Sequence, residues 1–131
     1  MGEGLELVRL EAVEPNRRGH HPGVFGLANG LARAGFLTLE DQVWWRRNND
    51  WCDAAYLDPS GVDPLVYDRD VNPGAKAWFR ASATPLVAKA REYGALLDRY
   101  GVACAERHTR DPGRVVYEDD VQVVAVPRPV G

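Results

Sequence analysis

The chain has 131 residues, enough for one ordinary domain and too few for two comfortable ones, so we expect a single compact domain over residues 1–131. Its composition, with 45% hydrophobic and 27% charged residues, is that of a globular protein and excludes a disordered, collagen-like or disulfide-rich chain. The formal net charge of -3 lacks the basic excess of a dedicated nucleic-acid binder, so nucleic acid is not an expected partner.

The compartment follows from the N-terminus and from cysteine usage. The first residues, MGEGLELVRLEAVE, are acidic where a signal peptide is basic, and no apolar run approaches the roughly 18 residues that span a bilayer. Cys52 and Cys104 lie far apart and neither belongs to a CxxC pair. We therefore expect a cytoplasmic protein with reduced thiols and no membrane partner.

The first third of the chain predicts a strand, a loop and a helix. Residues 5–13 are rich in Leu and Val and stop before Pro15, which is typical of a strand. Residues 14–23, EPNRRGHHPG, have the composition of a polar loop. Apolar residues then recur at helical spacing over residues 24–34, and Gly35 ends that helix.

A longer helix is expected over residues 39–57, because Thr38 and Asp41 resemble a capping box and no Gly or Pro follows until Pro59. One apolar stripe should contain Trp44, Trp51 and Ala55, joined by Cys52 and Tyr56. The opposite face should be solvated and holds Gln42, Arg46, Asn49 and Asp53. The pattern thus predicts that Trp51 is largely buried.

The second half predicts a long loop followed by alternating elements. Residues 58–74 contain three prolines and two glycines and should be irregular, with Tyr67 and Asp68 as candidates for a pocket rim. A strand over 75–80 leads to a helix with Thr84 as N-cap, ending at Gly101. Its predicted core face is Leu86, Ala90, Tyr93, Leu97 and Tyr100. A strand over 102–108 and a hairpin formed by 114–118 and 121–126 complete the chain.

The predicted fold class is α+β, with a small mixed or antiparallel sheet that ends in a C-terminal β-hairpin and is packed by about three helices. The order strand 75–80, helix, strand 102–108 indicates a crossover connection. Because the hairpin carries Val or Ala on both faces, at least one of its strands should be buried on both sides. Helices of the same chain provide that cover, or a second copy does, which would give a homodimer.

Four sequence strings lie within residues 56–127: DPSGVDPLVYD, NPGAKAWFRASA, LLDRYGV and GRVVYEDDVQVVAVP. In these the chain resembles small proteins that recur in actinobacterial genomes without an assigned activity. The resemblance implies a compact autonomous domain and no particular activity, cofactor or catalytic residue.

Metal and cofactor chemistry find little support in the sequence. Cys104 and His108 form a C-x3-H pair, but on a strand they lie about 13 Å apart, too far for one zinc ion. No G-x-G-x-x-G or Walker A pattern is present, so we expect neither a metal nor a cofactor. Glu106 and His108, two apart on one strand face, suit a general acid or base, or form an incidental ion pair.

The loop before the first helix is the main candidate site. Arg17, Arg18, His20 and His21 combine guanidinium groups and imidazoles at a helix N-terminus, a setting that favours anions. The alternative is a solvated loop. We expect a binding or regulatory protein for an anionic small molecule or a protein partner, with binding that strengthens from pH 8 toward pH 6. The alternative function is a small enzyme that uses His20, His21 or His108 as acid or base on an anionic substrate.

Overall fold

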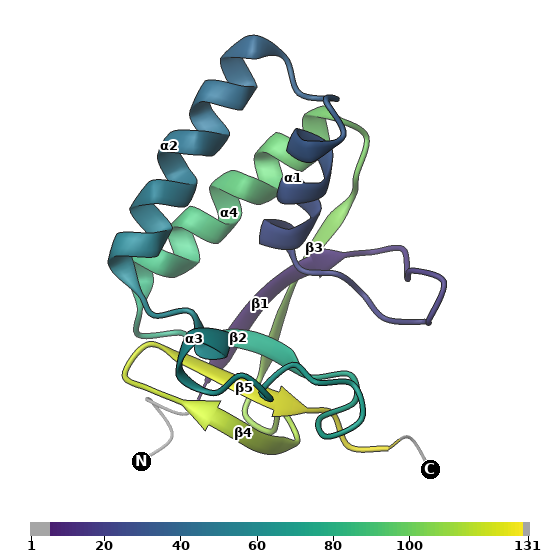
Figure 1. The fold of residues 1–131 in the computed structure, drawn as a ribbon, viewed down its shortest axis with the longest axis vertical. Helices are drawn as coiled ribbons and strands as arrows, with labels where there is room; N and C mark the ends of the chain where they lie inside the picture. Colours follow the sequence, from purple (N-terminus) through teal and green to yellow (C-terminus); the bar gives the residue numbers. More distant parts are fainter. Residues whose placement is uncertain (1–5, 130–131) are drawn as a thin grey trace.

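Five antiparallel strands form one sheet in the order β3-β1-β2-β5-β4 in the computed structural model, which describes residues 6–129 (Figure 1). The strands are β1 (Leu7–Ala12), β2 (Lys76–Arg80), β3 (Cys104–Thr109), β4 (Arg114–Glu118) and β5 (Gln122–Val126). The described helices are α1 (Val24–Arg33), α2 (Leu39–Ala55), α3 (Pro59–Val62) and α4 (Thr84–Arg99). The α+β class and the C-terminal hairpin are confirmed, whereas Leu5 lies outside the described residues. None of the helices in residues 6–129 is long and apolar enough to cross a membrane.

Strand β1 is the centre of the topology. Both β2 and β3 run antiparallel to it and flank it, so α4 connects two mutually parallel strands by crossing over β1. β1 pairs with β3 along its whole length, but with β2 only through Leu7–Arg80 and Val8–Phe79. Beyond Val8 the two strands diverge, as Figure 1 shows. This divergence makes room for two loops that approach each other beside the sheet.

The main core lies among α1, α2 and α4, and partly buried side chains of the sheet pack against it. The predicted core face of α4 is confirmed, since Leu86, Ala90, Tyr93 and Leu97 are buried and Tyr100 is half-buried. Phe25 of α1 packs edge-on against Phe79 of β2, with ring centroids 5.9 Å apart. Helix α4 begins one residue earlier than expected: Ala83 is its N-cap and Thr84 its first helical residue. Pro85 tolerates this shift because N–H groups of the first turn have no helical acceptor.

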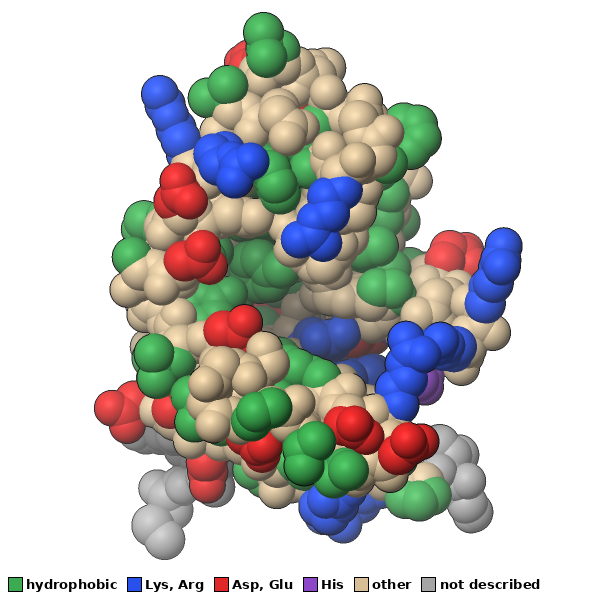
Figure 2. Space-filling view, in the orientation of Figure 1, with side chains coloured by type: hydrophobic (Ala, Val, Ile, Leu, Met, Phe, Trp, Pro, Cys, Tyr) green, Lys and Arg blue, Asp and Glu red, His purple; other side chains and the backbone are tan. Residues whose placement is uncertain are grey.

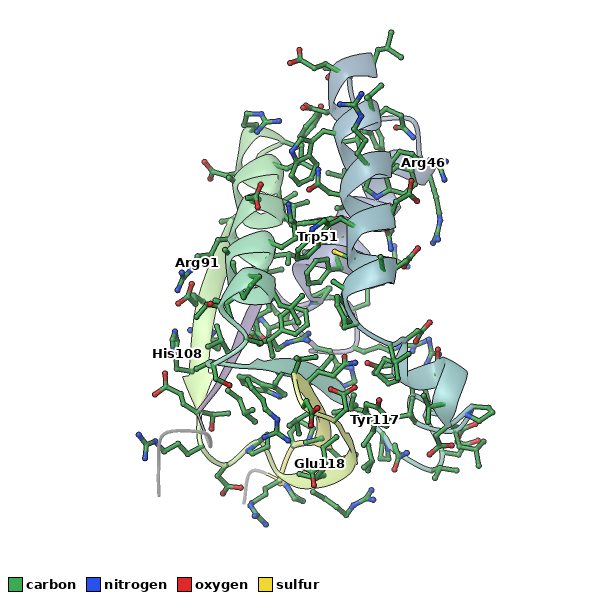
Figure 3. The ribbon with its side chains drawn as sticks, turned by 90° about the vertical axis from the view of Figure 1, so that its left-hand side faces the viewer. Arg46, Trp51, Arg91, His108, Tyr117 and Glu118 are labelled. Carbon is green, nitrogen blue, oxygen red and sulfur yellow. The ribbon has the colours of Figure 1, made fainter. Side chains whose placement is uncertain are left out.

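The predicted stripe of α2 is confirmed in part: Cys52 is buried and Trp44 and Tyr56 pack against the core, but Trp51 and Ala55 are exposed. Trp45 is only 7% exposed and lies in the core, whereas Trp51 is 39% exposed. Trp51 lies beside α4 in Figure 3, with the Lys89 ammonium 4.8 Å from its ring centroid. The cause is Asn49, expected on the solvated face, which is turned inward and hydrogen-bonded to Asn29 of α1 and Tyr93 of α4. A prediction that counts every asparagine as solvent-facing therefore misses the inward position of Asn49.

Strand β5 is buried by the chain itself. Gln122, Val123, Val124 and Ala125 are all buried, which confirms the expectation for one hairpin strand. The segment 58–74, expected to be irregular, includes the short helix α3, and the residue that precedes this segment contacts β5. Nε2 of Gln122 donates a hydrogen bond of 2.7 Å to the carbonyl of Leu57. The apolar pattern of β5 thus needs no second copy of the chain to explain it.

Candidate functional site

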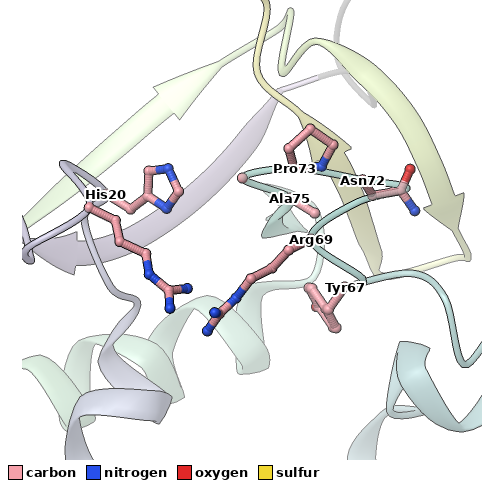
Figure 4. Close-up of a pocket in the computed structure, with 8 residues that line it drawn as sticks. His20, Tyr67, Arg69, Asn72, Pro73 and Ala75 are labelled. Carbon is pink, nitrogen blue, oxygen red and sulfur yellow. The ribbon is translucent and has the colours of Figure 1, made fainter.

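A pocket of about 350 Å³ lies between the loop that follows β1 and the loop that precedes β2. Figure 4 shows His20 on one side of it and Tyr67, Arg69 and Asn72 on the other. Its described lining consists of Arg18, His20, Tyr67, Arg69, Asn72, Pro73, Gly74 and Ala75, among which there is no carboxylate. The space-filling view shows Lys and Arg side chains inside a hollow between the helices and the segment that contains α3 (Figure 2).

The first loop is shaped by Asn16. Its Oδ1 accepts hydrogen bonds from the backbone N–H groups of Arg18, at 3.0 Å, and of His20, at 3.1 Å. Gly19 between them has φ of 78°, a left-handed conformation that favours glycine. This turn of the Asx type brings the side chains of Arg18 and His20 to one pocket.

His21 fastens the same loop to the sheet instead of lining the pocket. Its Nδ1 lies 2.9 Å from the carbonyl oxygen of Ala12, so this nitrogen carries the hydrogen and donates it. The backbone N–H of Ala12 in turn donates to the carbonyl of Pro22 at 2.8 Å. Of the four predicted ligand-binding residues, Arg18 and His20 therefore line the pocket, while Arg17 and His21 do not. No residue of α1 lines it either, so the second wall comes from a loop and not from a helix N-terminus.

The second loop is held by the buried amide of Asn72. Its Nδ2 donates to the carbonyls of Leu65, at 3.0 Å, and Val66, at 3.2 Å. Its Oδ1 accepts a long hydrogen bond of 3.4 Å from Arg114 of β4. Because one amide links three separate positions, Asn72 fixes the loop that carries Arg69. We regard Asn72 as a positioning residue, since its polar atoms are already engaged.

The two loops come close at Gly74. A Cβ atom built on this glycine would lie 3.7 Å from Nε2 of His20, in ordinary van der Waals contact. Its φ of 73° is again in the left-handed region, and this places a substitution here under backbone strain. His20 thus borders the end of the second loop, a few residues after Arg69.

The guanidinium groups of Arg18 and Arg69 have no protein partner in residues 6–129: neither makes a hydrogen bond or ion pair there. Most other arginines of the fold are engaged, for example Arg91 with Glu106 at 2.7 Å and Arg99 with Asp41 at 2.6 Å. A guanidinium is always charged and offers five N–H donors. Two such groups from separate loops are therefore available to an anion in the same pocket.

A fixed ion cluster occupies the gap between the diverging strands, next to this pocket. Glu11 is buried, with a side chain 5% exposed, and its Oε1 lies 2.8 Å from Nε of Arg9 and 3.6 Å from Nζ of Lys76. Arg107 approaches the other oxygen at 3.6 Å. Burial raises the pKa of Glu11, but the hydrogen bond from Arg9 and the nearby cations outweigh it and lower the pKa overall. Three cations around one carboxylate leave an excess of positive charge.

This cluster is connected to both loops. Arg9 donates hydrogen bonds of 3.0 Å to the carbonyls of Ala77 and His21, and so bridges β2 and the first loop. Burial and the charge of Asp58 raise the pKa of Tyr67, while the charge of Arg9 acts in the opposite direction. Tyr67 is therefore a protonated phenol at neutral pH, and its hydroxyl is a hydrogen-bond donor.

The predicted pair Glu106 and His108 forms, but on the outer strand β3 and away from the pocket lining. His108 Nε2 lies 2.7 Å from Glu106 and Nδ1 lies 2.8 Å from Glu6. These hydrogen bonds raise the pKa of His108, and Arg91 and His108 together lower the pKa of Glu106 to about 2. Figure 3 shows Arg91 and His108 along the same side of the molecule. Both ring nitrogens donate to carboxylates, so the arrangement is an ion-pair network.

The cysteines have the character of core residues. Cys52 is buried and Cys104 half-buried, both are unpaired, and burial raises the pKa of each thiol. Cys104 and His108 lie at different positions along β3, at the separation expected from strand geometry. Within residues 6–129 no group of three or more His, Cys, Asp or Glu side chains could hold a metal ion.

Arg69 is the pocket residue that sequence reasoning missed. It is the one basic residue between Asp50 and Asp70, and an isolated base in so acidic a segment was the available signal. Of the two predicted rim residues, Tyr67 lines the pocket and Asp68 does not. The chain matches no family model, no curated protein and no solved structure. The geometry of this pocket is therefore the basis for assigning a function.

Proposed function

We propose that this protein is a small binding module whose pocket holds the anionic group of a small molecule. The observation that carries the proposal is the pair Arg18 and Arg69, which line one cavity from two separate loops without a carboxylate partner in the described chain. His20 adds a third nitrogen-bearing side chain to the same lining. The unpaired cysteines support a reducing compartment, and we propose the cytoplasm.

The expected affinity follows from the contacts available. A hydrogen bond to a charged group contributes about 1.5 to 3 kcal/mol, and part of this is offset by the freedom that the anion and both side chains lose. An inorganic anion held by two guanidinium groups should therefore bind with a Kd of about 1 mM, which corresponds to a binding free energy of about -4 kcal/mol. Added salt should weaken the binding, since the sites are open to solvent.

Calorimetry with inorganic phosphate at fixed ionic strength tests the proposal. We expect Arg18→Ala and Arg69→Ala each to raise the Kd about tenfold, which corresponds to about 1.4 kcal/mol. The matched control is Arg47→Ala, which removes an exposed arginine of α2 and should leave the Kd unchanged. Absence of binding by the parent protein, or the same Kd for all four proteins, would contradict the proposal.

The alternative is an enzyme that uses His20 as general acid or base on the same anion. It is favoured by one observation, that the imidazole of His20 lines the pocket with Arg18 and Arg69. The two functions differ in what His20→Gln does. In an enzyme this variant should abolish turnover of an anionic substrate yet retain most of the binding, whereas a binding module shows no turnover in either protein.

A further inference from the structure

We propose, resting on the proposed function, that the natural ligand is an organic phosphomonoester whose phosphate lies between Arg18 and Arg69 and whose organic part carries a planar ring against Tyr67. Three features of the pocket favour such a ligand: the number of its donors, its size and the chemistry of its remaining wall.

The donors favour a phosphate over a carboxylate. A carboxylate has two oxygens in one plane, and one guanidinium fork satisfies both. Here two forks approach from different loops, Arg18 from the turn held by Asn16 and Arg69 from the loop held by Asn72. A phosphate monoester offers three terminal oxygens in a tetrahedral arrangement and carries a charge of about -1.5 to -2 near neutral pH. It can thus accept hydrogen bonds from two forks at once.

The charge around the pocket matches a dianion. No carboxylate is among its described lining residues. The buried carboxylate of Glu11 is surrounded by Arg9, Lys76 and Arg107, so its charge is already balanced. Asp68 and Asp70 flank Arg69 in the chain, but neither lines the pocket or pairs with Arg69 in residues 6–129. A ligand with a single negative charge would leave one guanidinium without a counter-ion.

The pocket has room for more than an inorganic anion. Its volume of about 350 Å³ is at the lower end of the range for small-molecule sites. A water molecule takes roughly 30 Å³ of liquid, and an inorganic phosphate is only a few times larger. The remaining space is bordered by the ring of Tyr67, by Pro73 and by Ala75. Tyr67 offers an aromatic face for a second ring and a hydroxyl for a polar substituent.

Four probe ligands separate the elements of this proposal in calorimetric titrations: phenyl phosphate, inorganic phosphate, benzoate and succinate. We expect phenyl phosphate to bind the parent chain about tenfold more tightly than inorganic phosphate, a gain of about 1.4 kcal/mol from the ring. Benzoate shares the ring and succinate carries two negative charges, and both should bind at least about tenfold more weakly than phenyl phosphate.

Variants of Tyr67 show whether the ring lies where we propose. Tyr67→Ala should bring the ratio of the two Kd values, inorganic phosphate over phenyl phosphate, from about ten to about one. Tyr67→Phe keeps the aromatic face and should retain the advantage, which guards against a loss caused by a disturbed loop.

The outcomes distinguish failure of the proposed phosphomonoester ligand from failure of the proposed anion-binding function. If benzoate or succinate binds as tightly as phenyl phosphate, or phenyl phosphate gains nothing over inorganic phosphate, this inference is overturned while the anion-binding function stands. The same holds if Tyr67→Ala keeps the full advantage. If no probe binds the parent chain, the proposed function fails as well.

Discussion

The hydroxyl of Tyr93 on α4 donates a hydrogen bond to Oδ1 of Asn49 on α2. Asn49 in turn donates to Oδ1 of Asn29 on α1 at 3.0 Å, and the indole N–H of Trp45 donates to the same oxygen at 2.9 Å. Helices α1, α2 and α4 are thus joined through side-chain hydrogen bonds in their common interior. A satisfied polar network of this kind fixes the relative positions of the helices.

Removing the amide should therefore destabilise the fold. Asn49→Ala leaves the hydroxyl of Tyr93 without its acceptor, and we expect a loss of about 1 to 3 kcal/mol in the free energy of unfolding. The neighbouring Asp50→Ala, an exposed position on the same helix, should change it by less than about 0.5 kcal/mol. Urea titrations of both variants measure the difference, and equal stabilities would show that the network contributes nothing.

Two tryptophans of α2 should respond very differently to truncation. Trp45→Ala removes a buried ring and should cost about 3 to 5 kcal/mol. Trp51→Ala removes a partly exposed ring that contacts Lys89 and should cost about 1 kcal/mol, the scale of an exposed cation–π contact. The midpoints of denaturant unfolding compare them directly. A larger loss for Trp51 than for Trp45 would mean that α2 presents its other face to the core.

Most of the fold was predictable because its elements have strong local signals. The core face of α4 and the burial of β5 follow from apolar spacing, and Gly101 ends α4 as its position suggested. The inward positions of Trp45 and Asn49 on α2 were not predictable in this way. Asn49 is polar by type, and only the neighbouring helices decide that its amide is used inside.

The site was half predictable for a similar reason. Arg18 and His20 are concentrated in one turn-forming loop, so their composition alone indicated a binding site. Arg69 and Asn72 lie some fifty residues away in a loop between other elements. They reach the pocket because β1 and β2 diverge after two residue pairs, a property of sheet register that no local pattern encodes.

Glu11 should contribute stability that depends on pH. The pKa of Glu11 in the folded protein is lowered below its ordinary 4.5, so ionised Glu11 stabilises the fold above that pH and the contribution is lost as the pH falls through the lowered pKa. Glu11→Gln leaves Arg9, Lys76 and Arg107 without their carboxylate and should cost about 2 to 4 kcal/mol at pH 7. The gap between parent and variant, measured by urea unfolding, should shrink toward pH 3. A gap independent of pH would contradict this account.

His108 should act in the opposite direction along the pH scale. Glu6 and Glu106 raise the pKa of His108 above its ordinary 6.5, so its contribution is complete below pH 6.5 and is lost as the pH rises through the raised value. The group is partly exposed, so solvent limits the effect to less than about 1 kcal/mol. Comparing the parent with His108→Gln at pH 5.5 and pH 9 should show destabilisation only at the lower pH. The account fails if the variant is equally destabilised at both.

The most direct measurement of the central claim, that an anion binds between the two loops, is a phosphate titration followed in ¹H–¹⁵N NMR spectra. The claim predicts that the amides of Arg18, His20, Arg69 and Gly74 shift together with one Kd, and that Arg69→Ala weakens the response at Arg18 and His20 across the pocket. Amides of the first turn of α1 and of exposed Arg47 should move little. Shifts confined to the α1 N-terminus, or scattered evenly over the arginines of the surface, would contradict a site shared by Arg18 and Arg69.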